Sequence, residues 1–173
     1  MKILPLALAL ATVASTAASA ADFVEFQLKT NAGESAGMAK VTESPKGVIL
    51  HIEAKGLPPG WHGMHFHEKG DCSKSDFTSA GGHVHAMTPV VHGLLNPQAN
   101  DSGDLPNLFV AADGTASAEL FSPFVSLRGA GGRPALLDAD GSALIIHAQP
   151  DDYTTQPIGG AGARVACGAI ISS

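Results

Sequence analysis

The chain has 173 residues, of which 45% are hydrophobic, and 16 acidic against 10 basic side chains give a formal charge of −6. This acidic balance offers no basic stripe that could meet phosphates, which argues against nucleic acid as a partner. The length suits one domain of ordinary size with a sizeable core, and no linker or internal repeat divides the chain.

The first twenty residues have the pattern of a bacterial secretory signal. Lys2 gives a positive start, residues 3–13 are largely apolar, and residues 18–20 form a small-residue cleavage signature. The apolar run is short and interrupted for a membrane span, although an uncleaved anchor is the alternative. We therefore predict a signal peptide at residues 1–20, cut after Ala20 or one residue later. No second apolar run approaches spanning length, so residues 21–173 are predicted to form a soluble, periplasmic domain.

The exported part is predicted to be all-β. The 20 glycines and 11 prolines of the whole chain recur too often for long helices, and short apolar runs with partial alternation indicate strands. In chain order the predicted strands are 23–28, 48–54, 64–67, 108–110, 115–121, 143–147 and 165–171. Turn signals lie at 44–47, 58–60, 113–114 and 140–141. Many short strands with such turns predict an antiparallel sandwich or barrel.

Three long stretches lack a strand pattern: residues 68–104, 122–140 and 149–163. Two of them flank histidines. Long loops on a β scaffold usually carry function, so we expect the functional side chains in these loops and at the adjoining strand ends.

The two cysteines, Cys72 and Cys167, indicate one disulfide if the protein reaches an oxidising compartment. Two free buried thiols are the alternative. The bond would close a long loop, for which the chain-entropy model gives about 4–5 kcal/mol of stabilisation.

Histidines indicate the chemistry. His65 and His67 alternate within a predicted strand, so both imidazoles face one side while Phe66 faces the opposite layer. His83 follows glycines that allow close backbone approach, and His147 ends an apolar strand. Each alone has an ordinary interpretation as a solvated or a satisfied core histidine. Because imidazole binds both copper and zinc, the central question is whether the fold brings these histidines together in a metal centre.

Six short segments follow one another along the chain in a fixed order. They are Gly60-Trp61-His62-Gly63-Met64-His65-Phe66-His67-Glu68, Gly70-Asp71-Cys72, Ser79-Ala80-Gly81-Gly82-His83, Gly103-Asp104-Leu105-Pro106-Asn107-Leu108, Ile146-His147-Ala148-Gln149-Pro150-Asp151-Asp152 and Gly160-Ala161-Gly162-Ala163-Arg164-Val165-Ala166-Cys167-Gly168. In this order they resemble the copper–zinc superoxide dismutase family, specifically its exported bacterial branch. The resemblance covers residues 22–171.

The resemblance implies an eight-stranded Greek-key β-barrel or sandwich that converts superoxide to dioxygen and hydrogen peroxide. The implied copper ligands are His65, His67, His83 and His147. His83 would bridge to zinc and would also take up and supply a proton during turnover.

The resemblance assigns further residues to the same centre. His92 and Asp104 would bind zinc, Cys72 and Cys167 would form the family's disulfide, and Asp151 would hydrogen-bond to His65 and His92 and fix their rings. Arg164 would guide the anion beside the open face of copper, because its guanidinium stays charged at any working pH. Lys69 and Lys74 are further candidates for a local positive zone. His62 would be structural, and His51 is expected on the outer face of its strand.

The chain departs from the family pattern at Asp101, where a third zinc histidine is usual. Zinc accepts carboxylate oxygen, so we expect Asp101 to be a ligand. His85, two residues from His83, is the alternative, and a weak or absent zinc site is the third outcome.

Other functions stay open at this point. A copper-only dismutase would lack zinc, and an exported copper- or zinc-binding module would need neither Arg164 nor an open coordination position. An electron-transfer copper site needs a cysteine thiolate, and both cysteines are assigned to the disulfide. Bacterial members of the family occur in more than one association state, so the resemblance leaves a monomer and a homodimer open.

Overall fold

The computed structural model describes residues 22–172. The predicted signal peptide at residues 1–20 lies outside the described residues. Among the described residues, no helical segment combines the length and apolarity that a membrane crossing needs.

Nine strands and two short 3-10 helices form the regular structure of residues 22–172. The strands are β1 (Phe23–Thr30), β2 (Ser35–Ser44), β3 (Gly47–Ala54), β4 (Gly60–His62), β5 (Met64–His67), β6 (Leu108–Val110), β7 (Ala116–Ser122), β8 (Ser142–His147) and β9 (Arg164–Ile170). The helices are η1 (Thr78–Ala80) and η2 (Ala130–Gly132). The predicted all-β class and the three long loops are confirmed.

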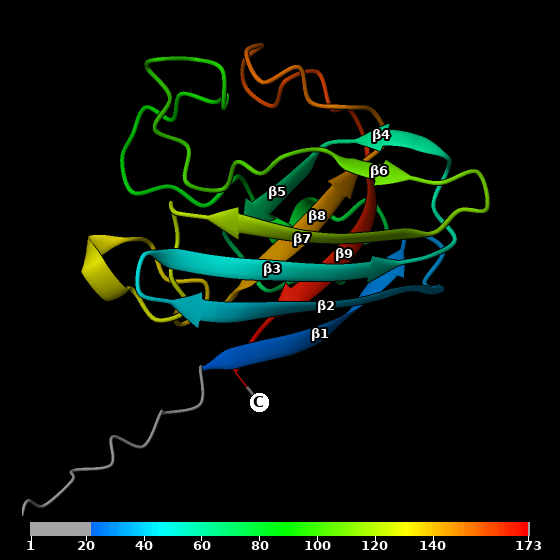
Figure 1. Ribbon diagram of the computed structural model, residues 1–173, viewed down its shortest axis with the longest axis horizontal. Coiled ribbons are helices and arrows are strands. Elements are labelled where there is room, and N and C mark those ends of the chain that lie inside the picture. The colour runs from blue at the N-terminus through cyan, green and yellow to red at the C-terminus, as the bar shows by residue number, and fades with distance from the viewer. Residues whose placement is uncertain (1–21, 173) are drawn as a thin grey trace, which may run out of the picture.

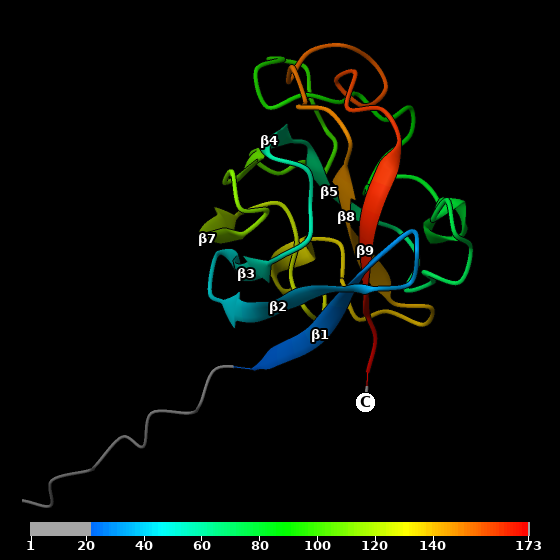
Figure 2. The same ribbon diagram turned by 90° about the vertical axis from the view of Figure 1, so that its right-hand side faces the viewer.

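Seven strands form one antiparallel sheet in the order β5-β8-β9-β1-β2-β3-β7, and β4 pairs with β6. The sheet curls, so that β1, β2, β3 and β7 form one wall and β5, β8 and β9 the other (Figures 1 and 2). The β4–β6 pair lies between the two edges, because β4 continues into β5 and β6 contacts β7. Neighbours that are distant in sequence, such as β9 beside β1, give the crossing connections of a Greek key.

The expected count of eight strands differs from the nine observed in residues 22–172 because one strand is broken at Gly63. β4 pairs with β6 before this residue, and β5 pairs with β8 after it. Instead of joining either ladder, Gly63 exchanges hydrogen bonds with the backbone of Gln149 and His147, both at 2.8 Å. A Cβ at this position would lie 2.9 Å from the Ala161 Cβ, so only glycine fits without a shift.

Alternation along β3 shows how the barrel core is filled. Val48, Leu50 and Ile52 are fully buried, whereas Ile49 and Glu53 between and beside them face solvent. Fully burying one such side chain contributes about 1.5–3 kcal/mol, so the inward-facing residues of the two walls dominate the stability of the barrel.

β5 and β8 are buried on both faces, which sets the position of the histidines. Met64 and Phe66 belong to the barrel core, as do Leu144 and Ile146 of β8. The alternate residues of both strands face away from this core and are covered by the long loops. His65 and His67 therefore point to the loop side, as the period-2 argument predicts.

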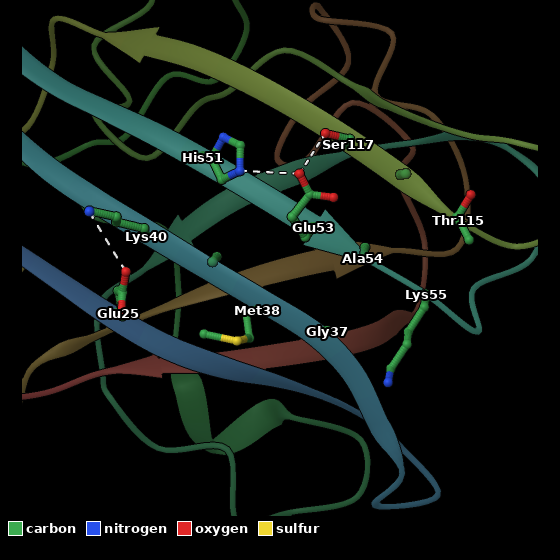
Figure 3. A pocket seen from close by; sticks show the side chains of 12 residues that line it. Glu25, Gly37, Met38, Lys40, His51, Glu53, Ala54, Lys55, Thr115 and Ser117 are labelled. Carbon is green, nitrogen blue, oxygen red and sulfur yellow. Dashed lines mark hydrogen bonds and ion pairs between the residues drawn. The ribbon is translucent and has the colours of Figure 1, made fainter.

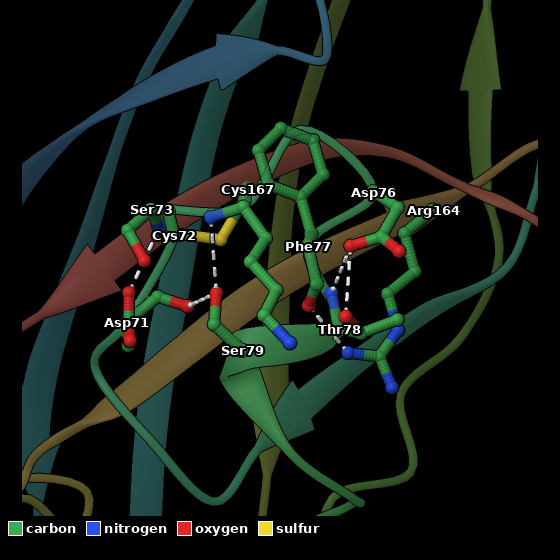
Figure 4. The surroundings of a disulfide bond; sticks show 10 residues. Asp71, Cys72, Ser73, Asp76, Phe77, Thr78, Ser79, Arg164 and Cys167 are labelled. Carbon is green, nitrogen blue, oxygen red and sulfur yellow. Dashed lines mark hydrogen bonds between the residues drawn. A yellow bond between two sulfur atoms is a disulfide. The ribbon is translucent and has the colours of Figure 1, made fainter.

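The long loops at residues 84–104 and 149–163 lie side by side at one end of the barrel in both views (Figures 1 and 2). A disulfide between Cys72 and Cys167 ties the chain after β5 to β9 (Figure 4). Phe77 and Ile145 are buried beside it in a second, smaller apolar cluster. The predicted cysteine pairing is confirmed, and the bond anchors the loop that carries His83.

A hollow of about 490 Å³ lies on the outer face of β2, β3 and β7 (Figure 3), and none of the buried histidines lines it. His51 lines it and faces solvent, as expected, with Nε2 at 3.2 Å from Glu53 Oε1. His51 is therefore separate from the buried histidine cluster.

Candidate metal centre

Four buried histidines converge on the loop side of β5 and β8. His65 and His67 come from β5 and His147 ends β8, while His83 lies in the loop and forms an isolated backbone bridge with His67. One ring nitrogen or ligand atom of each residue lies within 4.8 Å of the others. The fold therefore brings imidazoles from distant parts of the chain to one point.

Each of these rings is held by one nitrogen and leaves the other without a partner. The held nitrogens contact Asp151 Oδ2 (His65 Nε2, 3.0 Å), Gly81 O (His67 Nδ1, 3.0 Å), Asp101 Oδ2 (His83 Nδ1, 2.6 Å) and Gly162 O (His147 Nδ1, 3.0 Å). Within residues 22–172, His65 Nδ1 and the Nε2 atoms of His67, His83 and His147 are buried without a hydrogen-bond partner. Leaving buried nitrogens unpaired is costly, so these four atoms are suited to hold a bound ligand. Copper accepts imidazole nitrogen, and the set fits the donors of a copper ion.

A second set of four donors surrounds the opposite nitrogen of His83. Asp101 Oδ2 lies 2.6 Å from His83 Nδ1 and 3.7 Å from His92 Nδ1. Asp104 Oδ1 lies 2.6 Å from His92 Nδ1 and 3.7 Å from His83 Nδ1. A tetrahedral zinc shell has ligand–ligand separations of about 3.3 Å, so two imidazoles and two carboxylates of this kind fit a zinc ion.

Proximity alone also groups His65 with His83, His92 and Asp104. His65 is a poorer fourth donor here, because its Nε2 is bonded to Asp151 and its Nδ1 belongs to the first set. Asp101 contacts both rings directly and is the better choice. His85 takes neither place: its Nδ1 donates to the His83 carbonyl at 2.8 Å, and its ring is half-exposed.

Burial keeps the histidines of the first set neutral. Removal from water lowers the pKa of His65 to about 3, of His67 to about 2 and of His147 to about 4. The nearby His83 ring lowers all three pKa values further, while the hydrogen bonds that the rings donate to Asp151 and to backbone carbonyls partly oppose the shifts. A neutral imidazole has a free lone pair, which is the form that binds a metal.

In the second set, the carboxylates favour a positive charge, whereas burial disfavours one in the first set. Burial disfavours a charge on His92, but the nearby Asp101 carboxylate and hydrogen bonds to Asp104 and Asp151 outweigh it and raise the pKa of His92 to about 11. Burial also opposes ionisation of Asp101, yet the hydrogen bond from His83 and the nearby His92 ring hold its pKa below the ordinary value. Burial and the charge of Asp101 raise the pKa of Asp104. This half of the site therefore attracts a cation.

Without metal, the protein should become less stable as the solution is acidified. His65, His67 and His147 have an ordinary value of 6.5 when unfolded and lower pKa values when folded. Below pH 6.5 the unfolded chain thus binds more protons, and the free energy of unfolding falls with pH. The raised pKa of His92 also contributes stability, which is fully present below pH 6.5 and is lost only as the pH rises toward about 11. This contribution is constant in the acid range, so it does not oppose the trend. Urea unfolding of the metal-free protein between about pH 7 and pH 4.5 measures it, and a flat profile would contradict it.

Asp151 joins the two sets. Its Oδ2 lies 3.0 Å from His65 Nε2 and its Oδ1 lies 3.0 Å from His92 Nε2. Sequence reasoning gave no role to Asn107, although it lies in one of the quoted segments. Its side-chain amide donates to the Asp151 carbonyl and accepts from the Asp151 N–H, both at 2.9 Å. Asn107 therefore fixes the backbone of the carboxylate that orients both rings.

A pocket of about 310 Å³ opens over the first set of histidines. His67, His83 and His147 line it together with Arg164. The guanidinium is held at this place by its bonds to the carbonyls of Phe77 (2.6 Å) and Gly81 (2.7 Å). Burial lowers the pKa of Arg164, yet an arginine stays charged in proteins.

The two lysines proposed as helpers do not line this pocket. Lys69 lines a separate depression beside it, and Lys74 is exposed. Arg164 is therefore the cation that faces the open side of the histidines. His62 is structural in this arrangement, since it is buried with its ring nitrogens 2.6 Å from His147 O and 2.7 Å from Pro58 O.

The curled antiparallel sheet, the two donor sets that share His83 and the arginine-lined pocket define a β-barrel metalloprotein with a buried two-metal centre. The chain belongs to the copper/zinc superoxide dismutase family, whose model matches residues 35–170. The family implies copper and zinc as cofactors.

Similar proteins cover most of the chain. A Cu-Zn superoxide dismutase of Caulobacter vibrioides is 68% identical over 143 residues, which span 83% of this chain and 82% of that protein. The crystal structure of a SOD-like protein from Bacillus subtilis has a TM-score of 0.79 and 43% identity, covering 86% of this chain and 99% of that chain. The Cu/Zn superoxide dismutase from Brucella abortus has a TM-score of 0.68 and 29% identity, also covering 86% and 99%.

Proposed function

We propose that the protein converts two superoxide ions and two protons to dioxygen and hydrogen peroxide, with copper held by His65, His67, His83 and His147. Zinc is held by His83, His92, Asp101 and Asp104. The observation that carries this proposal is the placement of His83. Its Nδ1 faces the two carboxylates while its buried Nε2, without a hydrogen-bond partner in residues 22–172, faces the other histidines.

Bound copper supplies one-electron oxidation and reduction of superoxide, and bound zinc supplies a fixed positive charge on the opposite side of His83. The residues of the chain orient the donors and move protons. Asp151 fixes the rings of His65 and His92, so each presents one nitrogen in a set direction. When His83 Nε2 is not engaged as a metal donor, it would hold one proton and deliver it to the peroxide product. The second proton comes from solvent through the pocket.

Arg164 favours an enzyme over a metal-binding module without turnover. A storage site needs no fixed cation beside an open pocket, whereas an anionic substrate does. The guanidinium is held by two backbone carbonyls and faces the same pocket as His67 and His147. A local positive group can focus a small anion even though the whole chain is acidic.

Replacing Arg164 with alanine should slow superoxide consumption by about 10-fold or more while both metals stay bound, because steering by local charge changes association rates by about 10–1,000-fold. Arg164→Lys keeps the charge but loses the planar contacts, so it should retain part of the rate. Superoxide consumption is measured at several ionic strengths, with metal content determined on the same samples. A rate equal to the parent in Arg164→Ala would remove the guidance role.

Replacing Asp101 with alanine should weaken zinc binding by at least about 10- to 100-fold and leave copper in place, since even residues outside the ligand shell alter metal affinity by that factor. Asp101→His restores the residue usual in the family and should keep zinc. Metal analysis after dialysis against a weak chelator compares the variants. Unchanged zinc in Asp101→Ala would exclude Asp101 from the ligand set.

Activity in the parent tests the function itself. Metal-free protein reconstituted with copper and zinc should consume superoxide, and protein given zinc alone should not. Retained activity with zinc alone would rule out copper as the redox centre. Activity with copper alone and no zinc uptake would favour the copper-only dismutase.

The cellular place is part of the proposal. A signal peptide at residues 1–20 would deliver a domain of residues 21–173 to the periplasm, where the Cys72–Cys167 disulfide is stable. The mass of the protein recovered from a periplasmic extract tests the cleavage site. A homodimer stays a prediction, and the mass of the purified protein in solution decides it.

A further inference from the structure

The Gln156 side chain, in the loop at residues 149–163, forms hydrogen bonds with the backbone of His92. Gln156 accepts the His92 N–H at Oε1, 2.9 Å, and donates through Nε2 to the His92 carbonyl at 2.8 Å. Nε2 also donates to the Thr154 carbonyl at 3.0 Å, which anchors the amide in its own loop. The Gln156 amide thus pairs with both the N–H and the carbonyl of His92, as the backbone of a neighbouring strand would.

The same two loops also meet backbone to backbone near His92. Leu95 donates its N–H to the Tyr153 carbonyl at 3.2 Å. Gly93 has φ +121°, and a Cβ there would lie 2.2 Å from the Tyr153 carbonyl oxygen, so the close approach requires glycine. Gln156 therefore acts where the loops are already in contact, immediately beside a proposed zinc ligand.

Two groups from one loop fix both ends of His92. Asp151 holds the ring at Nε2, 3.0 Å, while Gln156 holds the backbone. With both ends fixed, Nδ1 is aimed at Asp104 Oδ1, 2.6 Å away. If the backbone hold is lost, the ring can pivot about the Asp151 contact and Nδ1 leaves the position shared with Asp104.

We propose that Gln156 is a positioning residue for His92 that slows the loss of the metal held by His92 and Asp104. This inference rests on the proposed function, which assigns zinc to those ligands. Gln156 does not touch the metal donors itself, so its effect passes through the His92 backbone. Residues that orient ligands from outside the shell typically change metal affinity by about 10–100-fold.

The test compares three variants of the protein loaded with copper and zinc: Gln156→Ala, Gln156→Glu and Gln98→Ala. Gln98 is a matched control, since it lies exposed on the same loop as His92 and its side chain makes no hydrogen bond within residues 22–172. Zinc release to a chromophoric chelator is followed far below the unfolding temperature. The visible spectrum of cobalt placed at the zinc position reports the ligand geometry.

Gln156→Ala should release zinc about 10-fold faster or more and shift the cobalt spectrum. Gln156→Glu should fall between this variant and the parent, because a carboxylate still accepts the His92 N–H but cannot donate to its carbonyl. Gln98→Ala should match the parent in both measurements.

Zinc release within twofold of the parent in Gln156→Ala would overturn the inference. So would faster release that simply follows a lower stability of the metal-free protein, with an unchanged cobalt spectrum. Asp104→Ala separates this failure from failure of the proposed function. If Asp104→Ala keeps its zinc, the zinc assignment and this inference fall together; if Asp104→Ala loses zinc and Gln156→Ala does not, only the role of Gln156 falls.

Discussion

His67→Ala should lose copper and more than about 100-fold of the superoxide-consuming activity, because even residues outside the ligand shell cost about 10–100-fold. His67 is buried in β5, and its Nδ1 donates to the Gly81 carbonyl at 3.0 Å, so the ring direction is fixed. The other ring nitrogen, Nε2, has no hydrogen-bond partner within residues 22–172. Removing the ring takes one of four converging donors, while the second donor set does not contain His67 and should keep zinc.

His51→Ala is the control for this variant. His51 lies on the outer face of β3 with its side chain 45% exposed (Figure 3), and it belongs to neither donor set. Its replacement should change neither metal content nor rate. Metal analysis and superoxide consumption on the same preparations make the comparison. Full copper occupancy and parent activity in His67→Ala would show that the four rings do not act together.

Replacing both cysteines with serine should lower the free energy of unfolding of the metal-free protein by about 4–5 kcal/mol, as chain entropy predicts for a closed loop of this length. Cys72 and Cys167 are separated by 95 residues, so the bond restricts much of the unfolded chain. Such a loss is a large fraction of the stability of an ordinary domain, about 5–15 kcal/mol. Denaturant unfolding of the parent and Cys72→Ser/Cys167→Ser measures the change.

The same substitution should also reduce activity through Arg164. The loop after Cys72 supplies the Phe77 and Gly81 carbonyls that hold the guanidinium, and Phe77 is buried beside the disulfide (Figure 4). Releasing that loop frees Arg164 from its place in the pocket. A free energy of unfolding within about 1 kcal/mol of the parent would contradict the stabilising role, since single interactions are typically of that size.

Periodicity predicted most of the barrel from the sequence. The alternating runs at β3 and β5 are visible because branched or aromatic side chains mark the buried face. β2 (Ser35–Ser44) was missed, because Ala36, Gly37 and Ala39 give little hydrophobic signal. Its pairing with β1 and β3 on either side decides its structure, and strand preference depends strongly on such context. The break at Gly63 depends on tertiary pairing and was equally invisible.

Some features of the candidate site could likewise be predicted from the sequence, and others could not. Local spacing sufficed to predict that His65 and His67 share a face. The approach of His83 and Asp101 depends on how residues 68–104 fold, and no spacing rule gives that; the family resemblance supplied it. The backbone-directed amides of Asn107 and Gln156 could be found only from the structure, because their partners are main-chain groups 44 and 64 residues away.

Anomalous diffraction from crystals grown with copper and zinc tests the central claim most directly. Data collected at both metal edges should place copper among His65, His67, His83 and His147. Zinc should lie on the other side of the His83 ring, against His92, Asp101 and Asp104. Copper absent from the four histidines, or both metals found away from His83, would contradict the account.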